Sequence, residues 1–192
     1  QPLDHLRAVS ALCRYAGDAL HLDGARLWNA HVATGVPLAD YGRLFDTVSV
    51  CLSKGLGAPV GSVLVGSAEA MAAARVQRKR LGAGWRQAGV LAAAGLFALD
   101  HHVERLAEDH EAARAFADAV SHHAPGVVPP ETNIVVVRTG QVPAGRIVAA
   151  ASARGVRLSQ VGAHVVRAVT HLDVTRAQCE TAGEVLGEVL AA

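Results

Sequence analysis

Lysine, cysteine and aromatic residues are scarce in this chain of 192 residues. Its three cysteines, Cys13, Cys51 and Cys179, are odd in number and far apart in the sequence. That spacing argues against a disulfide framework and favours a reducing, cytoplasmic location. Lysine is rarer still, because only two of the 18 Lys and Arg residues are lysines, Lys54 and Lys79. Each lysine position is therefore informative.

The chain also lacks a charge excess and a long apolar run. Its formal net charge is +1, and no Lys/Arg cluster is interleaved with aromatic side chains, so we expect no nucleic-acid binding. The longest apolar stretch, Val90–Leu99, is shorter than the roughly 20 residues that a membrane-spanning helix needs. No signal peptide is recognisable. Because the sequence begins at Gln1 without an initiator Met, we expect a fragment of a longer protein.

Apolar spacing predicts alternating helices and strands, which is typical of an α/β protein. Helices are expected at Leu3–Tyr15, Ala25–Val32, Ala68–Arg80, Arg86–Leu99, His101–Val120, Pro143–Arg154 and Thr175–Leu190. Strands are expected at Ala19–Leu22, Asp46–Ser53, Val60–Val65, Thr132–Arg138, Val156–Ser159 and Val165–Thr170. The proline-rich segment Pro125–Pro130 is expected to mark a lobe boundary. The nearly all-apolar helix Arg86–Leu99 is expected to be buried on most sides or to lie at a subunit interface.

Asp23 closes the first expected strand within His21-Leu22-Asp23-Gly24-Ala25-Arg26. In open α/β sheets, ligands bind at the carboxyl ends of the strands, where a carboxylate can hold a proton on a heterocyclic nitrogen. Gly24 allows close backbone approach, and Arg26 offers a bidentate fork for an anion. An equally simple interpretation is that Asp23 is the N-cap of the helix that follows.

Lys54 lies between two apolar strands, at the start of a glycine-rich turn. If this amine is buried, its pKa is lowered and the neutral form becomes available to react with a carbonyl. The alternative is a structural lysine that reaches from a strand end to solvent. An Asp strand followed by a Ser-Lys-Gly strand favours the first interpretation, because pyridoxal-phosphate enzymes need a carboxylate at the pyridine nitrogen and a lysine at the aldehyde.

Four segments, in collinear order along essentially the whole chain, resemble the low-specificity L-threonine aldolases. They are His21-Leu22-Asp23-Gly24-Ala25-Arg26, the run from Leu52 to Ser62 that contains Ser53-Lys54-Gly55, Gly84-Trp85-Arg86-Gln87-Ala88-Gly89, and Val169-Thr170-His171-Leu172-Asp173-Val174. The resemblance implies the later part of the large domain of pyridoxal-phosphate fold type I, over residues 1–105, with a mixed, mainly parallel sheet. A small α+β C-terminal domain would follow over residues 106–192.

The resemblance also implies site residues and a reaction. Lys54 would be catalytic and carry pyridoxal 5'-phosphate covalently, and Asp23 would pair with its pyridinium nitrogen. Arg86 would reach the cofactor phosphate of a neighbouring subunit. Arg26 and Arg167 would bind the substrate carboxylate, and Lys79 matches a family position close to the site. The family is a group of cytoplasmic lyases that cleave L-threonine or L-allo-threonine to glycine and acetaldehyde, in threonine catabolism and glycine biosynthesis, and that form homodimers or homotetramers.

Several alternatives stay open from the sequence. A fold relative that breaks a different bond, such as a β-eliminating lyase or a decarboxylase, would need the same lysine and carboxylate. A non-catalytic fragment is also possible, since the family's phosphate-binding glycine loop, ring-stacking histidine and carboxylate-side serine have no counterpart in this chain. His171, beside the substrate arginine in the last motif, would either shape the site or form a strand-end hydrogen bond.

The ten histidines do not form a recognisable metal motif. His101, His102 and His110 share one expected helix with acidic residues, but no H-E-x-x-H or C-x-x-C pattern is present. We therefore expect no metal site. The absence of a G-x-S-x-G elbow likewise argues against a serine hydrolase.

Overall fold

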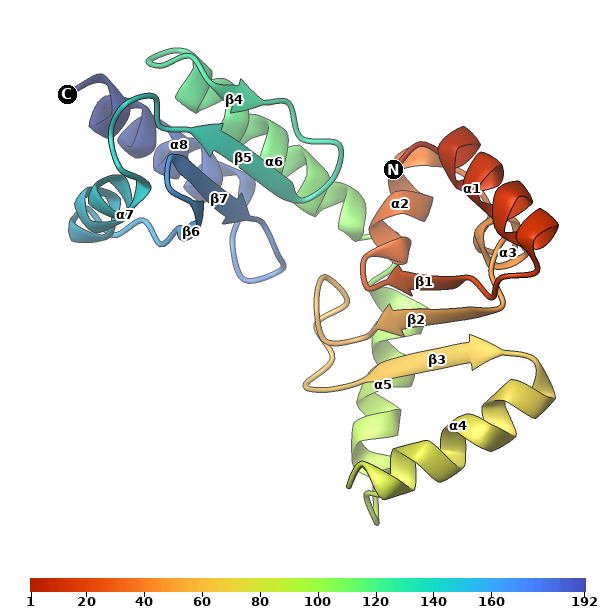
Figure 1. Ribbon diagram of the computed structural model, residues 1–192. Helices are drawn as coiled ribbons and strands as arrows, with labels where there is room; N and C mark the ends of the chain where they lie inside the picture. Colours follow the sequence, from red (N-terminus) through yellow and green to blue (C-terminus); the bar gives the residue numbers. More distant parts are fainter. The chain divides into compact units, whose positions relative to one another are not determined.

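The computed structural model describes residues 1–192 and divides them into two compact units, Gln1–Val103 and Glu104–Ala192 (Figure 1). Each unit has its own sheet and its own cluster of buried apolar side chains. The proline-rich segment at residues 125–130 lies inside the second unit, so the lobe boundary expected there is wrong. The assignment of residues 1–105 to a cofactor-binding domain and 106–192 to a small domain stays a prediction.

The first unit is built on a three-stranded sheet with the order β1-β2-β3. Its elements are α1 (Leu3–Ala16), β1 (His21–Gly24), α2 (Leu27–Thr34), α3 (Leu38–Gly42), β2 (Thr47–Cys51), β3 (Ser62–Gly66), α4 (Ala68–Arg80) and α5 (Gly89–His101). Strands β1 and β2 are parallel, whereas β2 and β3 are antiparallel. The core is small and centres on Leu27, Tyr41, Val48 and Val50.

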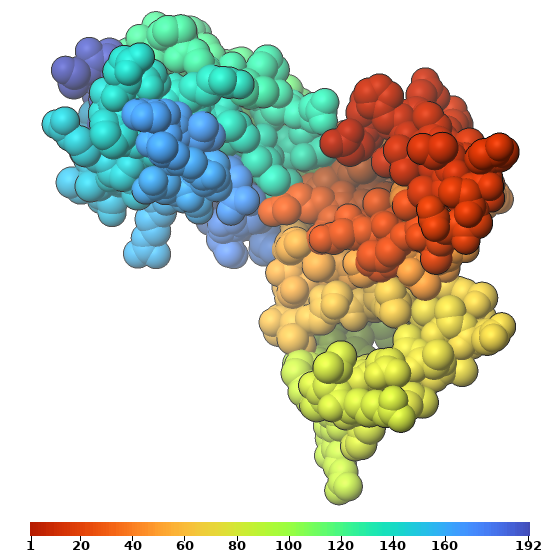
Figure 2. Space-filling view, viewed as in Figure 1, coloured from red at the N-terminus to blue at the C-terminus, as the bar shows by residue number.

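Strand β3 and helix α4 form the outer part of this unit. Every residue of β3 is exposed, and α4 has no buried residue. Figure 2 shows this yellow segment at the surface. Helix α5 is also largely exposed, with Val90, Leu96 and Phe97 each more than half accessible. The expectation that the apolar helix is buried on most sides is therefore wrong for this chain, and an interface role remains a prediction.

The second unit has an antiparallel four-stranded sheet with the order β4-β5-β7-β6. Its elements are α6 (Leu106–Ser121), β4 (Val127–Val128), β5 (Ile134–Arg138), α7 (Ala144–Ala153), β6 (Ser159–Gly162), β7 (Val165–Val169) and α8 (Arg176–Ala191). Helix α8 begins with a capping box, in which Thr175 and Gln178 satisfy each other's backbone N–H groups.

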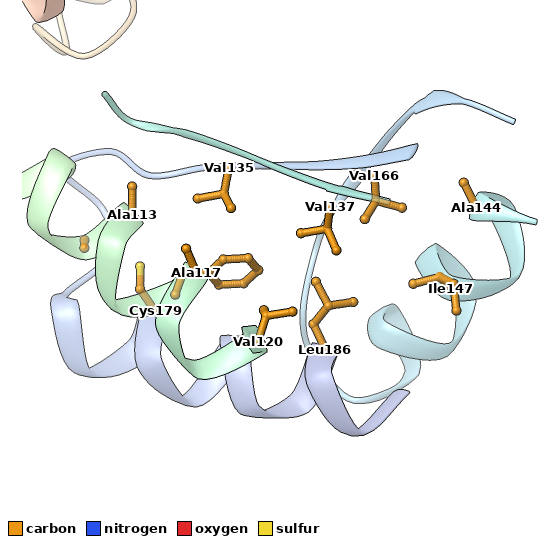
Figure 3. Packing of buried hydrophobic residues seen from close by; sticks show 12 residues of the cluster. Ala113, Ala117, Val120, Val135, Val137, Ala144, Ile147, Val166, Cys179 and Leu186 are labelled. Atoms are coloured by element: carbon orange, nitrogen blue, oxygen red, sulfur yellow. The ribbon is translucent and has the colours of Figure 1, made fainter. Parts of the chain in front are cut away.

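The core of the second unit lies between the sheet and the helices α6, α7 and α8 (Figure 3). Alternate residues of β5 point inward, so Val135 and Val137 are fully buried while their neighbours on the strand are more accessible. Val166 does the same on β7, and Leu186 meets these side chains from α8. Alternation therefore leaves one face of the sheet apolar and covered and the other free to carry polar side chains.

Helices α6 and α8 pack closely because α8 has glycine at the contact. A Cβ atom at Gly183 would lie 2.5 Å from the backbone oxygen of Phe116 and 2.7 Å from the Cβ of Ala119. Such distances are well inside van der Waals contact, so any larger residue has to push the helices apart.

We expect Gly183→Ala to lower the free energy of unfolding of the second unit by about 1–3 kcal/mol, because the added methyl overpacks the α6–α8 contact. The matched control is Gly145→Ala in α7, where the added Cβ would meet only the mobile end of the Gln160 side chain at 3.3 Å. The control should be neutral or slightly stabilising. Urea unfolding of both variants checks the prediction, and equal losses would contradict it.

His110 is a titratable residue buried in the second unit, on the inward face of α6. Burial lowers the pKa of His110 below its ordinary value of 6.5; the nearby Asp109 carboxylate opposes this effect, and Arg114 adds to it. The unfolded chain therefore binds a proton at a higher pH than the folded chain does. Stability contributed by the neutral ring is present above pH 6.5 and is lost as the pH falls below that value.

We expect the free energy of unfolding to decline from neutral pH to below pH 6.5, and His110→Gln to flatten part of that decline. His164→Gln, at an exposed turn, should keep the wild-type slope. Unfolding curves across this pH range provide the measurement. The same slope in wild type and His110→Gln would show that His110 does not cause the decline.

Most expected elements are confirmed, with specific departures. Helix α4 has the predicted bounds, and α1, α2, α7 and α8 agree to within two residues. The strand expected at Val156–Ser159 is wrong, because β6 begins only at Ser159. The short elements α3 and β4 were not expected. Each is too brief for a periodic apolar pattern to identify it.

Candidate active site

Asp23 and Lys54 lie at the same edge of the first sheet. Strands β1 and β2 run parallel, with Asp23 opposite Ser49 and Gly24 opposite Val50. Asp23 is near the carboxyl end of β1, and Lys54 lies in the turn that directly follows β2. Since parallel strands end at a common edge, the pairing brings together two residues that are 31 positions apart in the sequence.

The Asp23 carboxylate is exposed, and one of its oxygens is already engaged. Its Oδ1 accepts a hydrogen bond from the backbone N–H of Ala25 at 3.1 Å, which forms a local turn. Helix α2 begins beyond this turn, with Arg26 at its N-cap position and no side-chain cap. The N-cap interpretation of Asp23 is therefore wrong.

The Lys54 turn has a fixed backbone and an exposed amine. The N–H of Gly57 donates to the oxygen of Lys54 at 2.9 Å, and the N–H of Ala58 donates to the oxygen of Leu52 at 3.0 Å. Gly57 has a φ of 72°, in the left-handed region that glycine adopts without strain. The expectation that Lys54 is buried is wrong in this chain, because apolar residues flank the turn in sequence but do not cover the amine.

Two hydrogen bonds from distant residues anchor this turn. The indole Nε1 of Trp28 donates to the backbone oxygen of Cys51 at 3.1 Å, just before the turn. The Nδ1 of His102 lies 2.6 Å from the backbone oxygen of Leu56, whose side chain is 1% exposed. Sequence reasoning missed Trp28 and His102 in this role. No local pattern could identify them, since their partners are 23 and 46 positions away.

Three other expected site residues, Arg26, Lys79 and Arg86, also belong to the first unit. Arg26 follows Asp23 at the start of α2 and is half-buried. Lys79, in the last turn of α4, packs against the turn that follows, because a Cβ at Gly84 would lie 2.8 Å from its Cδ. Arg86 is exposed beyond that turn. Neither Lys79 nor Arg86 forms a hydrogen bond or an ion pair with Asp23 or Lys54.

Arg167 lies in the second unit, in the middle of β7. Its neighbours across the sheet are Val136 on β5 and Ser159 on β6. Because Val166 points into the core, alternation places Arg167 on the opposite, uncovered face. Its side chain is half-buried, and its Nε makes no hydrogen bond within the chain.

The remaining features of the molecule do not form a competing site. No group of three or more His, Cys, Asp or Glu residues is placed to hold a metal ion. The longest helices are neither long nor apolar enough to cross a membrane. A cavity of about 730 Å³ in the second unit is lined by Phe116, Leu158, Cys179 and neighbouring residues, among them His171 but not Arg167.

The residues at the first sheet edge fit pyridoxal phosphate. The exposed carboxylate of Asp23 suits a protonated ring nitrogen, and an exposed primary amine at Lys54 suits an aldehyde. Gly24 leaves the sheet edge flat beside Asp23, with its backbone held close to Ser49. That Asp23 and Lys54 hold the ring at its two ends stays a prediction.

Comparison with known proteins identifies the class. The family model for beta-eliminating lyases matches residues 1–141. The chain therefore belongs to the beta-eliminating lyase family.

The chain is also similar to individual curated proteins. The chain is 42% identical over 177 residues to the low specificity L-threonine aldolase of Escherichia coli strain K12, an alignment that covers 92% of this chain and 53% of the relative. It is 45% identical over 122 residues to the low-specificity L-threonine aldolase of Candida albicans, covering 64% and 33%. The chain thus spans about half the length, or less, of the curated relatives it matches.

Solved structures support the same fold. The threonine aldolase of Leishmania major superposes with a TM-score of 0.77 at 23% identity, over 98% of this chain and 57% of that structure. The ornithine delta-aminotransferase of Plasmodium falciparum superposes with a TM-score of 0.68 at 14% identity, over 98% and 51%. At these identities the likeness establishes the α/β fold, and it confirms the fold class expected from the sequence.

We expect Gly24→Ala to lower the free energy of unfolding of the first unit by about 1–3 kcal/mol. Its Cβ would lie 2.8 Å from the backbone oxygen of Ser49, an atom that cannot move without separating β1 from β2. Gly42→Ala in α3 is the control, since its Cβ would meet no atom within 4 Å. Chemical denaturation measures both, and a neutral Gly24→Ala would mean that the two strands tolerate a wider spacing.

Proposed function

We propose that this chain is part of a pyridoxal-phosphate-dependent aldehyde-lyase that cleaves L-threonine or L-allo-threonine to glycine and acetaldehyde. The observation that carries the proposal is that Asp23 and Lys54 lie at the carboxyl ends of two paired parallel strands. Membership of the beta-eliminating lyase family and 42% identity to a threonine aldolase over 92% of the chain support it.

The chemistry divides between the cofactor and the protein. Pyridoxal phosphate, when bound, supplies the electron sink that stabilises negative charge at the substrate Cα. The Lys54 amine would hold the cofactor through its aldehyde and would act as a base at the site. The Asp23 carboxylate would accept a hydrogen bond from the protonated ring nitrogen and favour that charged form.

The arginines orient the substrate. Arg26 and Arg167 each present a planar fork that matches a carboxylate in two parallel hydrogen bonds. Holding the carboxylate sets which bond at Cα is aligned to break, so orientation selects Cα–Cβ cleavage over loss of a proton or of the carboxyl group. Arg86 would bind a cofactor phosphate in a neighbouring subunit, and Lys79 would contribute to substrate binding.

The protein would act as a cytoplasmic homodimer or homotetramer in threonine catabolism and glycine biosynthesis. The exposed apolar face of α5, with Val90, Leu96 and Phe97, supports an interface with another subunit, because free proteins seldom leave such a patch in water. Three widely spaced, unpaired cysteines suit a reducing compartment.

A β-elimination activity is the second candidate, and the description of the matching family model favours it. Both reactions need Asp23 and Lys54 in the same roles. They differ in products, because elimination releases ammonia and a 2-oxo acid, whereas aldol cleavage of threonine releases acetaldehyde and glycine. Product analysis with L-threonine and L-allo-threonine therefore separates the two candidates.

In the full-length protein, we expect Lys54→Ala and Lys54→Arg to reduce acetaldehyde release from L-threonine by at least about 100-fold. The arginine variant keeps the positive charge but lacks an amine that can condense with an aldehyde. Both variants should also lose the visible absorbance that reports covalently held cofactor.

The control is Arg7→Ala, which removes only an exposed ion pair with Asp4 on α1. It should leave activity and absorbance at wild-type levels. Full activity in Lys54→Arg would rule out Lys54 as the nucleophile, and ammonia as the main product of the wild type would favour elimination.

A further inference from the structure

The second unit contains a cluster of buried polar residues outside its apolar core. Asp109, Asn133 and Thr170 are each at most 3% exposed. They come from α6, from the residue before β5 and from the residue after β7. Buried polar groups are costly unless they are hydrogen-bonded, so their contacts indicate what they hold in place.

These contacts converge on Thr170. Its backbone N–H donates to the backbone oxygen of Asn133 at 3.0 Å, and the Nδ2 of Asn133 donates to the backbone oxygen of Thr170 at 2.9 Å. The Thr170 hydroxyl donates to the backbone oxygen of Asp109 at 2.6 Å. The carboxylate of Asp109 is in turn paired with Arg105. Both the main chain and the side chain of Thr170 are thus fixed, to β5 and to α6.

The Thr170 clamp, formed by Asp109, Asn133 and Thr170, holds the carboxyl end of β7. The last pair of the β5–β7 ladder is Ile134 with Val169, and the clamp adds the next pair. At the other end of the ladder, the N–H of Thr139 donates to the oxygen of His164 at 3.0 Å. Strand β6 constrains β7 less firmly, because the register between them shifts between Gln160 and Gly162.

The register of β7 decides where Arg167 points. Val166, Ala168 and Thr170 face the helices, and Arg167 faces the other way. A slip of one residue would turn Arg167 toward the apolar core and remove its guanidinium from the open face. Thr170 is fixed three residues beyond Arg167. The position of Arg167 along the strand and the face of the sheet on which its side chain lies are therefore fixed as well.

We propose that Thr170, held by Asp109 and Asn133, is a positioning residue that orients Arg167 for binding a substrate carboxylate. The proposal rests on the proposed function, in which Arg167 binds that carboxylate. It assigns Thr170 no contact with substrate. Its effect is on binding, so it should change KM more than kcat.

The test uses Thr170→Val, which keeps the shape of the side chain and removes the hydroxyl, in the protein as its gene encodes it. We expect KM for L-threonine to rise about 5- to 10-fold, with kcat within about 3-fold of wild type, as befits loss of one orienting hydrogen bond. Thr170→Ser should restore KM to near the wild-type value. Thr181→Val is the control, since it removes an exposed hydroxyl bonded to Ala177 on α8.

If Thr170→Val does not fold, Asn133→Ala takes its place, because it removes only the side-chain bond to the Thr170 oxygen and should also raise KM. An unchanged KM in a folded clamp variant overturns the proposal. So does a Thr170→Ser variant as impaired as Thr170→Val, because that result would indicate a packing effect.

The same variants separate this proposal from the proposed function. If wild-type protein releases no acetaldehyde, the threonine aldolase function fails, and calorimetric titration with glycine becomes the readout for carboxylate binding. Weaker glycine binding in Thr170→Val than in Thr181→Val then supports the positioning role. Equal glycine binding in the two variants, or no measurable glycine binding in any of them, overturns it.

Discussion

The candidate site depends above all on the parallel pairing of β1 with β2. This pairing places Asp23 and the Lys54 turn at a common edge, although their strands are joined by two helices and a long connection. Gly24 makes the pairing possible beside Asp23, because a side chain there would collide with the backbone of Ser49. Trp28 and His102 then hold the Lys54 turn from either side. The placement of Asp23 and Lys54 at one edge of the sheet thus rests on backbone contacts that carry no reactive group.

The second unit holds Arg167 on β7, between β5 and β6. Its helices cover one face of the sheet with small and branched apolar side chains, and α8 approaches α6 closely because Gly183 has no side chain. Apolar packing is tolerant of small slips, whereas hydrogen bonds such as those of Thr170 depend on distance and angle. Polar groups in such a core contribute direction more than they contribute stability.

Local sequence patterns predicted some helices and strands correctly and misplaced others. Helix α4 has its predicted bounds, and in the structure Ser67 caps its first turn while Gly82 follows its last. The strand before Ser159 was misplaced, since an exposed edge strand leaves no strict alternation to read. Lys54 was expected to be buried because its neighbours are apolar. Its exposure follows from a turn in which Leu56 and Ala58 point inward while the lysine points out.

The sequence by itself determined which residues are chemically suited to a pyridoxal-phosphate site: a rare lysine after an apolar strand, a carboxylate at a strand end and arginines for a carboxylate ligand. Side-chain chemistry and local order are properties of short segments, so a reader of the sequence can recognise them. Only the tertiary structure decided that Asp23 and Lys54 share an edge, that Trp28 and His102 anchor the turn, and that Thr170 fixes the strand of Arg167. Those relations join residues tens of positions apart, and hydrogen bonds and packing at that range leave no periodic signal in the chain.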